Sequence, residues 1–128
     1  MSTPGNREIV EAFLKAAGSF EYDKAFGMLT EDCQYCNMPD PGTVRVGPKV
    51  AHGFLEAFFK PTVENDLKIL NIVEAGNIVF TERLDRHRLP DKWVELPVCS
   101  IFELRDGKIA AWREYFDMGT IARQWPAA

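Results

Sequence analysis

The chain has 128 residues, 46% of them apolar and 27% charged, with a formal net charge of −4. That length leaves room for one domain with one core, and no apolar run approaches the ~18 residues of a membrane-spanning helix. The negative charge, with Lys and Arg not gathered into a patch, disfavours nucleic acid as a partner. The N-terminal stretch MSTPGNREIV has no secretory pattern. A single cytoplasmic domain over residues 1–128 is therefore expected.

Three helices are expected in the first half of the chain. Apolar residues recur at helical spacing over residues 5–18, which predicts an amphipathic helix. A second, short helix is predicted within YDKAFGML at 22–29, followed by a strand at 32–38 that ends at a proline. A third helix is predicted within GPKVAHGFLEAFFK at 47–60, started by Pro48.

Strand patterns take over from residue 66. Turn signals at Gly76-Asn77, Pro90-Asp91 and Asp106-Gly107 separate the segments. Four consecutive strands are predicted, at residues 67–76, 77–87, 93–104 and 108–117. Helices followed by an antiparallel meander indicate an α+β domain, in which a curved sheet wraps around the N-terminal helices and leaves a cavity at its wide end.

The three cysteines do not form a convincing metal or redox site. Cys33 and Cys36 have C-x-x-C spacing, but a zinc site needs four ligands, and only Cys99, His52 and His87 remain to complete one. A redox pair favours a helix N-terminus, whereas this pair falls in a predicted strand. No metal and no cofactor is expected, and His52 is interpreted as a surface residue beside Glu56.

Two pairs of polar residues are out of place in predicted strands. Arg83 and Asp85 are two residues apart, as are Tyr35 and Asn37, so each pair lies on one face of its strand. If Arg83 and Asp85 point inward, a buried charged couple has to be explained. The side chains of Tyr35 and Asn37 are suited to holding a water molecule.

A third acid, Asp117, stands at the end of the last predicted strand. Its apolar neighbours in EYFDMGTI would suit an acid lining a pocket. The same position would also suit the cap of a short helix beginning in MGTIARQW. Both interpretations stay open on this pattern alone.

The stretches QYCNMP, ERLD and LPVCSIFELRDGKIAAWREYFD resemble the limonene-1,2-epoxide hydrolase family. That family has the cone-shaped, cystatin-like fold shared with nuclear transport factor 2 and the ketosteroid isomerases. The resemblance spans most of the chain. It implies a cofactor-independent epoxide hydrolase acting on a small apolar epoxide, terpene-like or cyclic, and water. It also implies a homodimer, for which the apolar strand WVELPVCSIFEL could supply an interface.

Site roles follow from the same resemblance. Asp117 would act as base on a water that Tyr35 and Asn37 also hold, Asp85 would protonate the epoxide oxygen, and Arg83 would bridge the two acids. Such a trio is neutral when one acid keeps its proton, which makes its burial tolerable. The implied reaction is direct attack by water, without a covalent intermediate, to give a vicinal diol.

The roles of two residues stay open, and so do three alternative functions. Ser100 stands where family members often have glycine, and His87 shares the predicted face of Arg83 and Asp85, so it could line the pocket mouth. The same fold hosts isomerases of the ketosteroid type, polyketide cyclases and non-catalytic binding modules. An isomerase would have no reason for an arginine between two acids, and a module would need no matched acid and base.

Overall fold

The computed structural model describes residues 5–126 and has the expected α+β architecture. Its helices are α1 (Asn6–Gly18), α2 (Tyr22–Phe26), α3 (Pro48–Phe58) and α4 (Met118–Ala122). Its strands are β1 (Leu29–Asn37), β2 (Val44–Val46), β3 (Glu64–Ala75), β4 (Ile78–Arg88), β5 (Trp93–Arg105) and β6 (Lys108–Tyr115). Between residues 5 and 126, no helix is long and apolar enough to cross a membrane.

The six strands form one mixed sheet in the order β2-β1-β6-β5-β4-β3. Strands β3 to β6 are the expected antiparallel meander, and β1 joins it by parallel pairing with β6. Both residues of the Asp106-Gly107 turn have positive φ, at 51° and 80°. That conformation is typical of the two-residue hairpin turn that joins strands such as β5 and β6.

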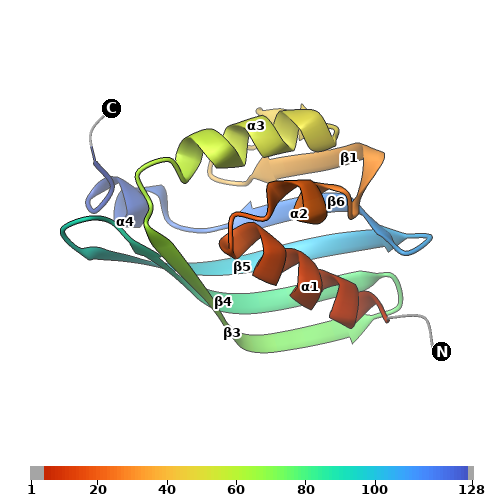
Figure 1. The fold of residues 1–128 in the computed structure, drawn as a ribbon. Helices are drawn as coiled ribbons and strands as arrows, with labels where there is room; N and C mark the ends of the chain where they lie inside the picture. The colour runs from red at the N-terminus through yellow and green to blue at the C-terminus, as the bar shows by residue number, and fades with distance from the viewer. Residues whose placement is uncertain (1–4, 127–128) are drawn as a thin grey trace.

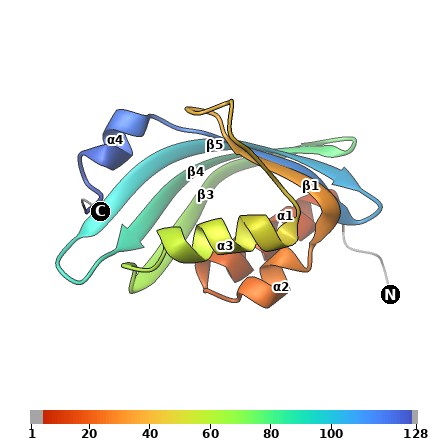
Figure 2. The same ribbon diagram turned by 90° about the horizontal axis from the view of Figure 1, so that it is seen from above.

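The sheet is strongly curved, and α1, α2 and α3 lie on its concave side (Figures 1 and 2). Phe13 of α1 is fully buried and anchors this contact. Its ring meets Trp112 of β6 edge-on at 5.0 Å between centroids and Phe26 of α2 at 6.0 Å. Aromatic side chains therefore pack the space between the helices and the sheet near α2.

The structure differs from the sequence prediction at several elements, and three of these differences matter most. The second helix ends at Phe26, because the chain already enters β1 at Leu29. The short edge strand β2 was not predicted. Strand β6 ends at Tyr115, so that Asp117 lies outside the sheet and precedes α4.

A bulge in β6 decides which of its side chains face the helices. Glu103 and Leu104 of β5 pair with Ala111 and Ile109, which leaves Ala110 as an extra residue. Ile109 and Trp112 are three residues apart, yet both are buried on the inner side. From Trp112 onward the regular alternation resumes, and it turns Glu114 inward.

Candidate active site

The inner face of β4 carries four consecutive polar side chains. They are Thr81, Arg83, Asp85 and His87, and none is more than 8% exposed. Strand alternation puts all four on the side of the sheet that the helices cover, while the residues between them face outward. The charged pair anticipated from the sequence is therefore buried, and the structure has to compensate it.

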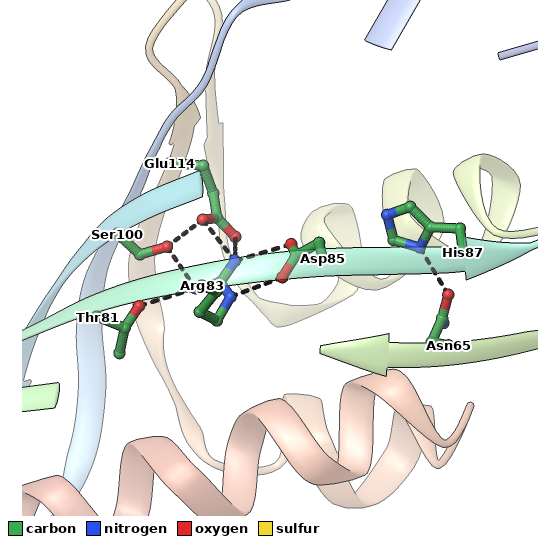
Figure 3. A network of polar contacts seen from close by, with 7 residues as sticks. All are labelled: Asn65, Thr81, Arg83, Asp85, His87, Ser100 and Glu114. Carbon is green, nitrogen blue, oxygen red and sulfur yellow. Dashed lines mark hydrogen bonds and ion pairs between the residues drawn. The ribbon is translucent and has the colours of Figure 1, made fainter. Parts of the chain in front are cut away.

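Arg83 is the centre of a closed hydrogen-bond network (Figure 3). Its Nε and Nη2 donate to the two oxygens of Asp85 at 2.9 and 3.1 Å. Its Nη2 also donates to Glu114 of β6, at 3.0 and 3.2 Å. The remaining nitrogen, Nη1, donates to the hydroxyls of Thr81 at 2.9 Å and Ser100 at 2.6 Å. All three guanidinium nitrogens are thus satisfied, and the planar fork holds two carboxylates at once.

Ser100 of β5 completes the network on its far side. Its hydroxyl accepts from Arg83 and donates to Glu114 Oε2. Ser100 is 1% exposed, so the sequence position marked as unusual lies in the site. Its hydroxyl fixes both the cation and one of its acids.

The electrostatics of the network depend on the pairing of Arg83. Burial alone would lower the pKa of Arg83, but the nearby carboxylates of Glu114 and Asp85 outweigh that effect and raise it above its ordinary value. One guanidinium balances one carboxylate. Because the cluster holds two carboxyl groups, it is neutral overall only if one of them carries a proton. Such a proton is available for chemistry.

The expected role of Asp117 is not supported by its position. It is exposed, and it caps α4 by accepting hydrogen bonds from the backbone N–H of Thr120 at 2.8 Å and the Thr120 hydroxyl at 2.7 Å. The acid that contacts Arg83 is Glu114 instead. The hydrogen bonds from Thr120 lower the pKa of Asp117, which makes it a weaker base. The capping interpretation of this residue is therefore correct, and its assignment as the second bridged acid is wrong.

Tyr35 and Asn37 lie beside the network on β1. The Tyr35 hydroxyl donates to Asn37 Oδ1 at 3.0 Å. In the parallel pairing of β1 with β6, Tyr35 lies opposite Trp112 and Asn37 opposite Glu114. The Tyr35 ring stacks on Trp112 at 3.9 Å between centroids. Burial, together with the charge of Glu114, raises the pKa of Tyr35, so that its hydroxyl keeps its proton and remains a donor.

These polar groups line a cavity of about 270 Å³ whose other lining residues are mostly apolar. This volume lies just below the ~300–1,000 Å³ range of small-molecule pockets. Both polar pairs, Glu114 and His87 line it, and Asp117 does not. Its other walls come from α1, α3, β5 and α4, through residues that include Phe54, Phe58, Leu96, Val98 and Ile121. The cavity suits a small, mostly apolar ligand.

Clustered ligands and the C-x-x-C pair are the groups that metal or thiol chemistry would need. Within residues 5–126, no cluster of three or more His, Cys, Asp or Glu side chains is arranged to hold a metal ion. Cys33 and Cys36 are buried in β1, and burial raises the pKa of Cys33 to about 12. A reactive cysteine needs the opposite shift.

Glu114 is the residue that sequence reasoning missed. It belongs to the inner set of β6 positions with Trp112, whereas Asp117 lies two residues beyond the strand. The available signal was an acid between Trp112 and Phe116 in strand alternation, since an acid between two aromatic side chains on one face is unusual unless it has a buried partner.

Known proteins resemble this chain in sequence and in fold. Residues 4–127 match the family model described as limonene-1,2-epoxide hydrolase catalytic domain. The chain is 35% identical over 109 residues to the epoxide hydrolase EphG of Mycobacterium tuberculosis, a match that covers 85% of this chain and 71% of that protein. A solved M. tuberculosis LEH-like epoxide hydrolase superposes with a TM-score of 0.79 at 30% identity, covering 92% of this chain and 86% of the other.

More distant structures share the fold alone. A SnoaL-like protein from Shewanella denitrificans superposes with a TM-score of 0.85 at 15% identity, covering 95% of this chain and 97% of the other. A protein with a ketosteroid isomerase-like fold from Catenulispora acidiphila gives a TM-score of 0.81 at 17% identity, covering 96% and 93%. The curved sheet around N-terminal helices is therefore common to proteins whose sequences differ widely, and the site must distinguish them.

Proposed function

The chain belongs to the limonene-1,2-epoxide hydrolase family, and we propose that it adds water directly to a small apolar epoxide, terpene-like or cyclic, to give a vicinal diol. The observation that carries this proposal is the buried guanidinium of Arg83, held between the carboxyl groups of Asp85 and Glu114 at 2.9–3.2 Å. Epoxide opening by water requires one acid and one base, and Arg83 holds two carboxyl groups that can fill these roles.

Glu114 is the proposed general base. Its register partner Asn37 and the Tyr35 hydroxyl line the same cavity, so a water between them has two polar groups to orient it and a carboxylate to take its proton. Ser100 and Arg83 both donate hydrogen bonds to the Glu114 carboxylate. The carboxylate is thereby held in one orientation before substrate arrives, which lowers the entropic cost of attack.

Asp85 is the proposed general acid. The water oxygen forms a bond to one ring carbon while that carbon's bond to the ring oxygen breaks, so attack inverts the carbon. The water proton passes to Glu114, and the Asp85 proton passes to the ring oxygen. Asp85 then carries the negative charge that Glu114 held before, and Arg83 contacts both. The net charge of the trio does not change during the reaction, and return of one proton through solvent restores it.

Two variants with matched chemistry test the assignment of the base. Glu114→Gln is expected to lower kcat by about 10²–10⁴-fold on limonene oxide or cyclohexene oxide, because an amide cannot accept the proton of water. Asp117→Asn is expected to retain activity within about twofold, since asparagine caps a helix as well as aspartate does. The reverse pattern would return the base to Asp117. A folded wild-type protein that turns over no epoxide would favour a binding module.

A single-turnover reaction in heavy-oxygen water tests direct attack. The label is expected in the diol and not in the protein. Label found in an enzyme carboxylate and passed on to the diol would establish a covalent ester intermediate instead.

A homodimer is part of the same proposal. The outer face of the sheet carries apolar side chains that helices do not cover, and Val73, Phe80 and Tyr115 are 42–58% exposed there. Val73 lies opposite Phe80 in the β3–β4 pairing, so the exposed apolar positions are adjacent, as at an interface. Sedimentation of the wild type against Phe80→Glu tests this, with a shift to monomer expected for the variant.

A further inference from the structure

His87 is the one polar group of the β4 inner face that takes part neither in the Arg83 network nor in the proposed reaction. It is 3% exposed, lines the cavity, and follows Asp85 by two residues. Aromatic rings surround it, with centroids at 5.6 Å for Phe59, 5.6 Å for Trp125 and 6.0 Å for Phe58. A buried imidazole in an apolar wall has a desolvation cost, so its hydrogen bonds have to be accounted for.

The tautomer of His87 follows from a chain of two hydrogen bonds. Asn65 Nδ2 donates to the backbone carbonyl of Gly18 at 3.2 Å. This contact fixes the amide, so that Asn65 Oδ1 is the atom facing His87 Nδ1 at 2.7 Å. A carbonyl oxygen only accepts, and Nδ1 must therefore carry the hydrogen.

The other ring nitrogen, Nε2, is then a bare acceptor. Burial lowers the pKa of His87 and the charge of Arg83 adds to this effect, although Asp85 opposes it. The neutral ring has its lone pair on Nε2. Nε2 forms no hydrogen bond to any group of residues 5–126, and it lies on the side of the ring toward Asp85 (Figure 3). Nε2 of His87 is therefore a hydrogen-bond acceptor for a ligand in the cavity.

We propose that His87 Nε2 and Asp85 form a two-point recognition site for an epoxide that also carries a hydroxyl group. The hydroxyl donates to Nε2 while the epoxide oxygen meets Asp85. The Cα atoms of two residues at this spacing in a strand lie about 7 Å apart. A hydroxyl placed across a six-membered ring from the epoxide spans a comparable distance. This inference rests on the proposed epoxide hydrolysis and narrows its substrate class.

A matched pair of substrates tests the preference. One is a cyclohexene oxide with an isopropyl group across the ring from the epoxide, and the other bears a hydroxyl on the central carbon of that isopropyl group. Wild type is expected to favour the hydroxylated epoxide in kcat/KM by about 3–10-fold, as for one net hydrogen bond. In His87→Leu the ratio is expected to fall to one or below. The matched control is His52→Leu, because His52 is the second histidine of the chain and lies outside this cavity. This variant is expected to keep the wild-type ratio.

If His87→Leu fails to fold, the position of the His87 proton can be measured directly in the wild-type protein. Long-range nitrogen–proton spectra of histidine-labelled wild-type protein are expected to show the His87 proton on Nδ1 and a shift of Nε2 when the hydroxylated diol binds. A proton found on Nε2 overturns the proposal.

The two proposals fail in different ways. Equal turnover of both epoxides by wild type refutes the His87 subsite and leaves epoxide hydrolysis standing. No turnover of either refutes the proposed reaction. In that case binding decides the His87 subsite. Tighter binding of the hydroxylated epoxide than of its apolar partner, with a shift of the His87 Nε2 resonance, supports the subsite, and equal binding refutes it.

Discussion

Replacing Arg83 by methionine removes the cation and leaves both carboxyl groups in place. Arg83 is 2% exposed, and Asp85 and Glu114 are each 8% exposed. The variant therefore strands two buried acids that water reaches poorly. Breaking a buried ion pair by removing one partner costs about 3–5 kcal/mol. A domain of this size has about 5–15 kcal/mol of stability, so Arg83→Met is expected to remain folded at low temperature with a much lower urea midpoint.

The pH dependence identifies the cause of that loss. In the proposed trio the folded wild type keeps one proton on its two acids. Without the guanidinium, the folded variant is expected to bind one proton more than the folded wild type near neutral pH. Its stability relative to wild type should then rise as the pH falls from 7 toward 5, by up to about 1.4 kcal/mol per pH unit. Urea unfolding at several pH values, followed by circular dichroism, measures the slope.

A triple variant, Arg83→Met with Asp85→Leu and Glu114→Met, serves as the control. It removes the cation and both acids together. The hydroxyls of Thr81 and Ser100 lose Arg83 as a donor, but they lie opposite each other across β4 and β5 and can form a hydrogen bond to each other. Its stability is expected within about 2 kcal/mol of wild type, since apolar replacement of a buried ion cluster is often neutral. A triple variant as unstable as the single one, or a single variant that loses less than about 1 kcal/mol, would refute the stranded-charge reasoning.

Three further outcomes are expected. Ser100→Ala should lower the unfolding free energy by about 1–3 kcal/mol in urea, because it strands a buried acceptor and donor, while the exposed neighbour variant Cys99→Ser should stay within about 0.5 kcal/mol. Wild type should lose stability relative to His87→Leu as the pH falls below about 6.5, because burial lowers the pKa of His87 and the unfolded chain takes up the proton first; equal thermal midpoints at all pH values would contradict this. Diol formation should survive dialysis against a chelator, because the proposed acid, base and bridge are all side chains, and loss of turnover that a metal ion restores would refute it.

Local patterns were enough to predict most of the fold. Helical spacing in the first half and turn signals in the second predicted α1, α3 and the meander β3–β6. These signals are short-range, because periodicity and turn residues act within a few residues of each other. The parallel pairing of β1 with β6 and the edge strand β2 depend on contacts between distant segments, for which no local pattern exists.

For the site too, the sequence predicted the relations within one strand, and the tertiary structure decided the contacts between strands. Alternation within one strand determined that Arg83 and Asp85 share a face, and likewise Tyr35 and Asn37, because a two-residue spacing sets that relation wherever the strand lies. Which distant acid meets Arg83 was decided by tertiary structure. A single extra residue in β6, Ala110, and the end of that strand at Tyr115 turn Glu114 inward and leave Asp117 to cap α4. A bulge of one residue reverses every face assignment across it, and nothing in the run KIAAWREYFD marks where it falls.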